Sequence, residues 1–203
     1  MFTGVLGQFY DFSIDLFFNN LTAQWHLSKP IEAKSAKDLT DYLERLHFFN
    51  YSLWHEEDEA RRTDVSDSVI ARVKRNIDKF NQNRNDTIQR IDEELYHLLS
   101  SGGFSLNSGS LNSETPGSMI DRNSIMSLKI YHMNEIAVNP LEKPELKAQC
   151  ATKVLKLQEQ QKDLESCIKN LLFDIFQKRR YYKVYFQFKM YNDPNLNPAL
   201  KNK

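Results

Sequence analysis

The most chemically informative residues are charged and amide side chains at positions where a helix would normally bury an aliphatic one. Two segments show this pattern, NYSLWHEEDEAR at 50–61 and DKFNQNRNDTIQRID at 78–92. A carboxylate on a buried helix face must pair, bind a cation or accept a proton, because an isolated buried charge is too costly. An arginine there can form a bidentate pair with a carboxylate or a phosphate. The two segments therefore predict either a buried polar network or a ligand site.

In the first segment, Asn50 and Glu57 fall on the apolar stripe of the expected helix, one heptad apart. Trp54, Asp58 and Arg61 lie along the edge of the same stripe. An ion pair of Glu57 or Asp58 with an arginine of the protein would fix the register between helices, while a ligand would use the same groups. A solvated charged face is the third interpretation of this segment.

His55 is followed directly by four acidic residues, which suggests a metal site. The spacing does not match the H-E-x-x-H zinc motif, because no second histidine follows at i+4. Mg²⁺ needs only a few oxygen ligands, and Glu57, Asp58 and Asp86 are the carboxylates that would supply them. The sequence contains no P-loop, nucleophile elbow, paired CxxC motif or dinucleotide fingerprint.

In the second segment, Asn81, Arg84 and Asn85 crowd the buried stripe, and asparagine is a poor helix former in mid-helix. Their presence implies compensating hydrogen bonds, within the protein or to a ligand. In an antiparallel hairpin Asn50 and Asn81 can meet, whereas Glu57 and Arg84 are offset by roughly 15 Å at ~1.5 Å rise per residue. A single pocket holding both would need another helix to bridge them.

A third segment, 115–132, places Asp121 on the buried line of a helix, with Arg122 and Lys129 beside it. Residues 115–118 (TPGS) would begin this helix with free backbone N–H groups, which can bind an anion. The plainer interpretation is an ordinary helix cap with flanking ion pairs.

The elements that position these residues are helices, because apolar side chains recur every three to four residues along almost the whole chain. Ser35 is predicted to cap the second helix, with Asp38 three residues later. The expected helices span 8–26, 35–61, 67–99, 116–138 and 145–190. We therefore predict an all-α fold, an elongated antiparallel bundle of about five helices in a single domain.

The bundle is expected to consist of two helical hairpins, 35–100 and 116–190, joined by a flexible linker at 100–114 that is rich in glycine and serine. An irregular tail, 191–203, would follow. In the last helix, apolar residues alternate four and three from Cys150 onward, which is a coiled-coil pattern that serves internal packing or a homodimer equally well. Residues 183–189 (KVYFQFK) also alternate with period two, but a lone strand would have no partner, so a helix is expected.

Composition excludes several classes of protein. The 203 residues carry 27 basic and 27 acidic side chains, so the net charge lacks the basic excess of a typical nucleic-acid binder. Basic and aromatic residues interleave at 178–189 and could contact a polyanion, but packing with solvated charges explains them as well. No run of ~18 apolar residues predicts a transmembrane helix. Nor does the N-terminus, with acidic Asp11 and Asp15, resemble a signal peptide.

The two cysteines, Cys150 and Cys167, lie on the last expected helix, roughly 25 Å apart at ~1.5 Å rise per residue. That separation is far beyond disulfide reach. Both are therefore expected to be reduced core thiols, which favours a cytoplasmic location.

Four segments together resemble a bacterial helical family known as domain of unknown function 4254. They are LWHEEDEAR (53–61), IDKFNQNRNDTIQRID (77–92), ETPGSMIDRNSIMSLKIYHM (114–133) and KVYFQFKMYNDPNLNP (183–198). Asn123 departs from the pattern at a packing position where the family suggests leucine. The resemblance implies an intracellular bacterial protein without an assigned activity, often encountered beside glycosyltransferases of surface-polysaccharide assembly.

Two hypotheses follow. The first is an accessory protein that binds a polar or anionic ligand, or a protein partner. The residues that would contact this ligand are Trp54, His55, Glu57, Asp58, Arg61, Asn81, Arg84, Asn85, Asp86, Asp121, Arg122 and Lys129. The second is a metal-assisted hydrolase of a phosphorylated small molecule or nucleotide, with Mg²⁺ on the three carboxylates named above and the phosphate on Arg84 or Lys129. Three carboxylates converging within about 5 Å in an open cleft would favour the hydrolase.

Overall fold

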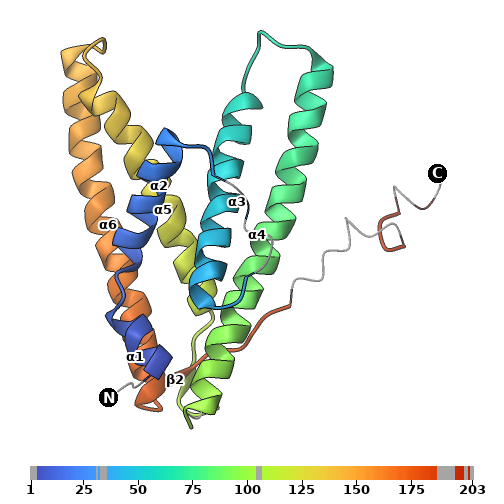
Figure 1. Ribbon diagram of the computed structural model, residues 1–203, viewed down its shortest axis with the longest axis vertical. Helices are drawn as coiled ribbons and strands as arrows, with labels where there is room; N and C mark the ends of the chain where they lie inside the picture. Colours follow the sequence, from blue (N-terminus) through green and yellow to red (C-terminus); the bar gives the residue numbers. More distant parts are fainter. Residues whose placement is uncertain are drawn as a thin grey trace.

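The fold is all-α, as the periodicity predicts. A computed structural model describes residues 4–30, 32, 36–103, 107–186, 195–198 and 201 (Figure 1). Its helices are α1 (Gly4–Asp11), α2 (Ile14–Leu27), α3 (Leu39–Glu59), α4 (Asp67–Ser101), α5 (Pro116–Val138) and α6 (Pro144–Phe176). Two short strands, β1 (Ser110–Leu111) and β2 (Arg180–Tyr181), pair in parallel. Within the described residues, no helix is both long and apolar enough to cross a membrane.

The long helices form two pairs that lie side by side in Figure 1 and diverge toward one end. One pair is α3 with α4, and the other is α5 with α6. Helix α2 lies against α5, α3 and α6, and α5 contacts α2, α3, α4 and α6. Helix α5 is therefore the element around which the other helices gather.

The apolar core has two parts. The larger cluster includes Phe18, Leu46 and Ile91, all fully buried, and extends to α5 and α6. The smaller one joins Leu53 of α3 to Ile77 of α4 near the connection between these two helices. Along the sequence of α3, Asn50 lies between residues of the two clusters, and Arg84 does so along α4.

Local signals explain where the helices begin. Thr115 caps α5 by accepting a hydrogen bond from the Ser118 N–H at 3.3 Å, and Pro116 occupies the first turn. Asp38 caps α3 by accepting a hydrogen bond from the Asp41 N–H at 3.0 Å. Ser35, predicted for that role, lies outside the described residues.

The Asp38 cap provides a direct test of local stabilisation. Asp38→Ala is expected to lower the free energy of unfolding by about 1 kcal/mol, because the N–H of Asp41 loses its acceptor. Ser66 is the matched control, since it precedes α4 but its side chain makes no capping hydrogen bond. In urea denaturation at neutral pH, Ser66→Ala should change stability by no more than a few tenths of that amount. Equal losses in the two variants would contradict the role of Asp38.

The first predicted helix, 8–26, is two helices in the structure. A break at residues 12–13 separates α1 from α2, and Ser13 caps α2 by accepting a hydrogen bond from the Leu16 N–H at 3.3 Å. The periodicity of apolar residues continues across this break, so it gave no sign that the helix is interrupted. Ser13 is the local signal that could have located it.

The prediction that the last helix continues to 190 was wrong. Helix α6 ends at Phe176, and Lys178 has a left-handed backbone with φ 58°. The chain then pairs as β2 with β1, a strand that lies in the predicted linker. Tyr182 follows with a fully buried side chain whose hydroxyl donates to the backbone carbonyl of Asp92 at 2.9 Å. The strand thus precedes the segment with period-two alternation, whose described residues 183–186 are neither helix nor strand, and residues 187–190 lie outside the described residues.

The cysteines are both free, but only one is in the core. Cys150 is buried, whereas Cys167 is exposed, so the expectation of two core thiols was wrong for Cys167. The reason is its position on α6: Cys150 and Ile168 lie on the buried stripe, and Cys167 lies on the outer face.

Candidate functional site

A cavity of about 330 Å³ opens between α3, α4 and α5. Its lining comprises Asn50, Leu53, Trp54, Glu57, Asp58, Arg61, Asn81, Arg84, Ile125 and Leu128. Glu57 and Arg84, expected to be offset within the α3–α4 hairpin, both line it because α5 completes the wall between them. Six of the twelve sequence candidates therefore lie around one cavity.

A bidentate ion pair forms the floor beneath the cavity. Arg84 Nε donates to Asp121 Oδ1 at 2.9 Å, and Arg84 Nη2 donates to Asp121 Oδ2. Asn50 Nδ2 donates to Asp121 Oδ1 at 2.9 Å and to Ser124 Oγ at 3.0 Å. The hydrogen bond to Asp121 raises the pKa of the Arg84 guanidinium, although burial opposes the shift. Asp121 and two of the Arg84 donors therefore find their partners within the protein, as expected for a buried polar network.

The network continues behind the floor to a histidine that the sequence did not single out. His47 is fully buried between Thr22 Oγ1, 2.9 Å from Nε2, and Ser124 Oγ, 2.8 Å from Nδ1. Burial lowers the pKa of His47 to about 3, and the nearby His26 adds to the effect. His47 is therefore a neutral hydrogen-bonding link rather than a group that changes charge near neutral pH.

Asn123, the departure from the family pattern, belongs to a second buried network. Its side-chain amide donates to Asp15 Oδ1 at 2.7 Å, and Gln161 Nε2 donates to Ser127 Oγ at 2.7 Å close by. Burial raises the pKa of Asp15 to about 6, and the hydrogen bond from Asn123 opposes the shift. A leucine at position 123 could not donate a hydrogen bond to Asp15. Asn123 therefore provides a polar contact between α2 and α5 rather than apolar packing.

Two polar groups at the cavity remain available to a ligand. Within the described residues, neither the side-chain amide of Asn81 nor Arg84 Nη1 has a protein hydrogen-bond partner. At the rim, Glu57 and Arg61 form an i,i+4 pair at 3.3 Å whose side chains are largely exposed. The cavity thus offers unused donors on α4 and a mixed-charge rim on α3.

Four sequence candidates lie away from the cavity lining. Asn85 lines a smaller cavity of about 90 Å³ that also includes Asp92. Asp86 accepts a hydrogen bond from Gln82 at 2.7 Å and lines another hollow, so it does not join Glu57 and Asp58. Arg122 pairs with Glu114 at 2.8 Å, and Lys129 is exposed.

The start of α5, where the free backbone N–H groups could bind an anion, is capped by side chains of the protein itself. The Gly117 N–H donates to Asp92 Oδ1 at 2.6 Å, and the Ser118 N–H donates to Thr115 Oγ1. A Cβ at position 117 would lie 2.6 Å from the Ile88 carbonyl oxygen, so only glycine allows α5 to approach α4 this closely. The plainer interpretation, an ordinary cap, therefore describes this helix end.

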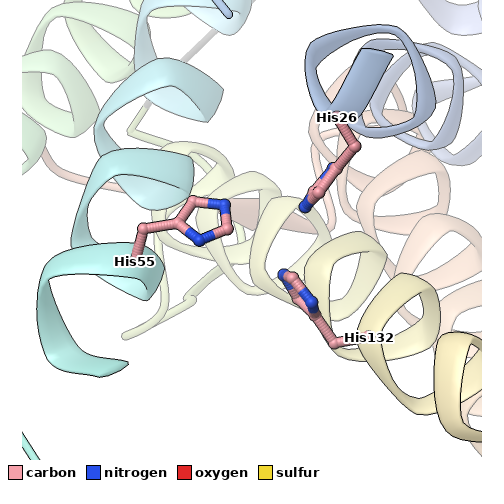
Figure 2. Close-up of side chains that lie close together, drawn as sticks. All are labelled: His26, His55 and His132. Atoms are coloured by element: carbon pink, nitrogen blue, oxygen red, sulfur yellow. The ribbon is translucent and has the colours of Figure 1, made fainter. Parts of the chain in front are cut away.

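The remaining candidate, His55, belongs to a cluster of three histidines. Figure 2 shows the rings of His26 from α2, His55 from α3 and His132 from α5 turned toward a common space. One ring nitrogen from each lies within 4.8 Å of the other two. In the described part of the chain, these three histidines form the group of potential ligands that is close enough to share a metal ion, and the group contains no carboxylate.

Burial dominates the electrostatics of the cluster. It lowers the pKa of His55 and of His132, while the charge of Asp58 opposes the shift in both rings. The indole of Trp54 stacks on the His132 ring with centroids 4.9 Å apart and planes 4° from parallel. Since Trp54 and Asp58 also line the cavity, the cavity and the histidine cluster share a wall.

The sequence could not reveal this cluster, because each histidine comes from a different helix. The two partners of His55 are far from it in sequence, His26 by 29 residues and His132 by 77, so no local spacing motif links them. The only sequence signal was His55 itself, beside an acidic run.

Together these features define an all-helical protein with a polar interior and a cavity bordered by a histidine cluster. Residues 40–184 match the family model described as Protein of unknown function (DUF4254), and the chain belongs to this family. The matched region contains the whole cavity lining, His55 and His132, whereas His26 precedes it. No curated protein and no solved structure matches the chain.

Proposed function

We propose that this chain is an accessory protein that binds a small polar or anionic molecule in the cavity between α3, α4 and α5. The observation that carries the proposal is the pair of unused donors, the Asn81 amide and Arg84 Nη1, beside an accessible cavity. Both residues are partly exposed, so these donors can bind water in the free protein, and an acceptor group of a ligand in the cavity can replace it.

The lining narrows the class of ligand. Leu53, Ile125 and Leu128 provide apolar walls, while the rim carries both carboxylates and arginine. An anionic group would accept hydrogen bonds from Arg84 Nη1 and Asn81, and hydroxyl groups would donate to Glu57 or Asp58. The volume of about 330 Å³ lies at the lower end for small-molecule sites. A single phosphorylated sugar therefore suits the cavity better than a complete nucleotide sugar does.

Sugar phosphates and nucleotide sugars are also the first compounds to test on the basis of the family resemblance, which implies an association with bacterial surface-glycan assembly inside the cell. Thermal-shift screening detects them directly, because a ligand that binds only the folded protein raises its melting temperature. Calorimetric titration then gives the dissociation constant of each compound that produces a shift.

The matched pair Asn81→Ala and Asn85→Ala tests whether binding occurs in this cavity. Loss of one ligand hydrogen bond at Asn81 is expected to weaken binding about 5–10-fold, which corresponds to ~1 kcal/mol. Asn85 lies one turn further along α4 and lines a different cavity, so its variant should bind as the unaltered protein does. Absence of any shift with these ligands, or equal weakening in the two variants, would contradict the proposal.

A metal-assisted hydrolase of a phosphorylated small molecule or nucleotide is the second candidate. The observation that favours it is the pair of carboxylates that line the cavity, Glu57 and Asp58, which would hold Mg²⁺ together with water. Phosphate release from these compounds would favour the hydrolase, and binding without turnover would favour the accessory protein.

A further inference from the structure

Each histidine of the cluster has one ring nitrogen without a hydrogen-bond partner. Nε2 of His26, of His55 and of His132 is buried in each case, and none of them has a partner among the described residues. A buried unsatisfied nitrogen is uncommon, because it gives up a hydrogen bond to water without replacement. Three of them in one place indicate a group that the protein alone does not supply.

The protonation of two of these rings follows from the partners of their other nitrogen. His26 Nδ1 lies 2.7 Å from the carbonyl oxygen of Thr22, and His132 Nδ1 lies 2.8 Å from Glu135 Oε2. Both partners accept hydrogen bonds, so Nδ1 carries the proton and the neutral ring presents a lone pair on Nε2. Lone pairs on neighbouring nitrogens cannot satisfy each other, whereas a cation would satisfy all of them.

We propose that His26, His55 and His132 bind one divalent transition-metal ion through their ring nitrogens, a site that is independent of the ligand proposed for the cavity. Imidazole ligands suit Zn²⁺, Co²⁺, Ni²⁺ and Fe²⁺ and disfavour Mg²⁺ and Ca²⁺, which prefer oxygen. Three histidines with a fourth position left for water is the arrangement of zinc sites that act on substrates.

The geometry fits an ion after small side-chain rotations. Ring nitrogens that lie within 4.8 Å of one another would have to approach to roughly 3.3 Å around a tetrahedral ion with metal–nitrogen distances near ~2.05 Å. The three rings come from separate helices and turn toward one space, as Figure 2 shows, so each can adjust without moving the others' backbones.

The surroundings match those of a metal centre. A carboxylate and a backbone carbonyl orient His132 and His26 through Nδ1, as is usual for metal-binding histidines. The ring of Tyr131 stacks on His26 at 3.9 Å between centroids, and Tyr51 lies 4.4 Å from the His55 ring. This aromatic shell, with Trp54 on His132, limits the access of water to the ion.

The experiment uses the full chain, purified without a polyhistidine tag and stripped with a chelator. Titration with Co²⁺ and with Zn²⁺ is expected to show one ion per chain, with the visible absorption of Co²⁺ in a nitrogen-coordinated site. His132→Ala should weaken metal binding by more than about 100-fold, because losing a metal ligand lowers the affinity more than losing the residue that orients this ligand. Glu135→Gln should weaken it about 10-fold through the altered orientation of His132.

His97→Ala is the matched control, since His97 is exposed on α4 and should leave the affinity unchanged. Asn81→Ala should also bind the metal normally, so failure of the cavity proposal and failure of this one give different results. If His132→Ala does not fold, Glu135→Gln decides, because Glu135 is exposed. Absence of one bound ion per chain in the unaltered protein, or unchanged affinity in Glu135→Gln, would overturn the metal site.

Discussion

Asp121→Ala is expected to lower the free energy of unfolding by about 3 kcal/mol, because it leaves the Arg84 guanidinium partly buried without its counter-charge. The Asp121 side chain is 6% exposed and that of Arg84 is 25% exposed, so solvent replaces the lost contacts only in part. The substitution also removes the acceptor of the Asn50 amide. Urea denaturation followed by circular dichroism measures the effect.

The size of the loss in unfolding free energy distinguishes a buried ion pair from one on the surface. Arg122 and Glu114 form an exposed ion pair at 2.8 Å, and Arg122→Ala should change stability by less than about 1 kcal/mol. The double variant Asp121→Leu with Arg84→Met should recover much of the loss, because apolar residues of similar size need no counter-charge. If Asp121→Ala costs no more than Arg122→Ala, the floor of the cavity is not held by this pair.

How far the sequence predicts the site depends on whether the signal is local. Asn50, Arg84 and Asp121 were identifiable because each replaces an aliphatic residue on a helical stripe, and the structure brings all three into contact. Their meeting across α3, α4 and α5 could not be derived, because register between non-adjacent helices is set by packing. The histidine cluster is the extreme case, since only the fold brings His26 and His132 to His55.

The same distinction applies to the fold. The predicted helix 116–138 has the bounds of α5, because Thr115 and Pro116 mark its beginning and Asn139-Pro140 its end. The end of α6 was missed, because it depends on burial of Tyr182 against α4 and on pairing with a strand from the predicted linker. Those contacts join residues that are distant in sequence, and the period-two pattern begins only at residue 183, after the strand.

The contribution of Asp92 to the free energy of unfolding is expected to fall as the pH rises from about 4 to about 7, whereas buried His47, whose pKa is lowered to about 3, contributes a slope of the opposite sign. Asp92 is 3% exposed, and burial raises its pKa to about 6 from 3.8, although hydrogen bonds from Thr115 and Gly117 oppose the shift. Between pH 3.8 and about 6, Asp92 retains a proton in the folded protein that it has lost in the unfolded chain. Raising the pH through this range therefore removes up to about 3 kcal/mol of the stability that Asp92 contributes, at 1.36 kcal/mol per pKa unit.

Asp92→Asn isolates this contribution from that of Asp15, whose pKa burial raises to about 6 with the same sign. The asparagine retains an oxygen that can accept the hydrogen bond of the Gly117 N–H but has no proton to lose. In urea denaturation at pH 4, 5, 6 and 7, the stability of the unaltered chain relative to Asp92→Asn should therefore fall as the pH rises. Asp86→Asn, an exposed change on the same helix, should keep the original slope. Parallel curves for Asp92→Asn and the unaltered chain would mean that Asp92 does not hold its proton where α4 meets α5.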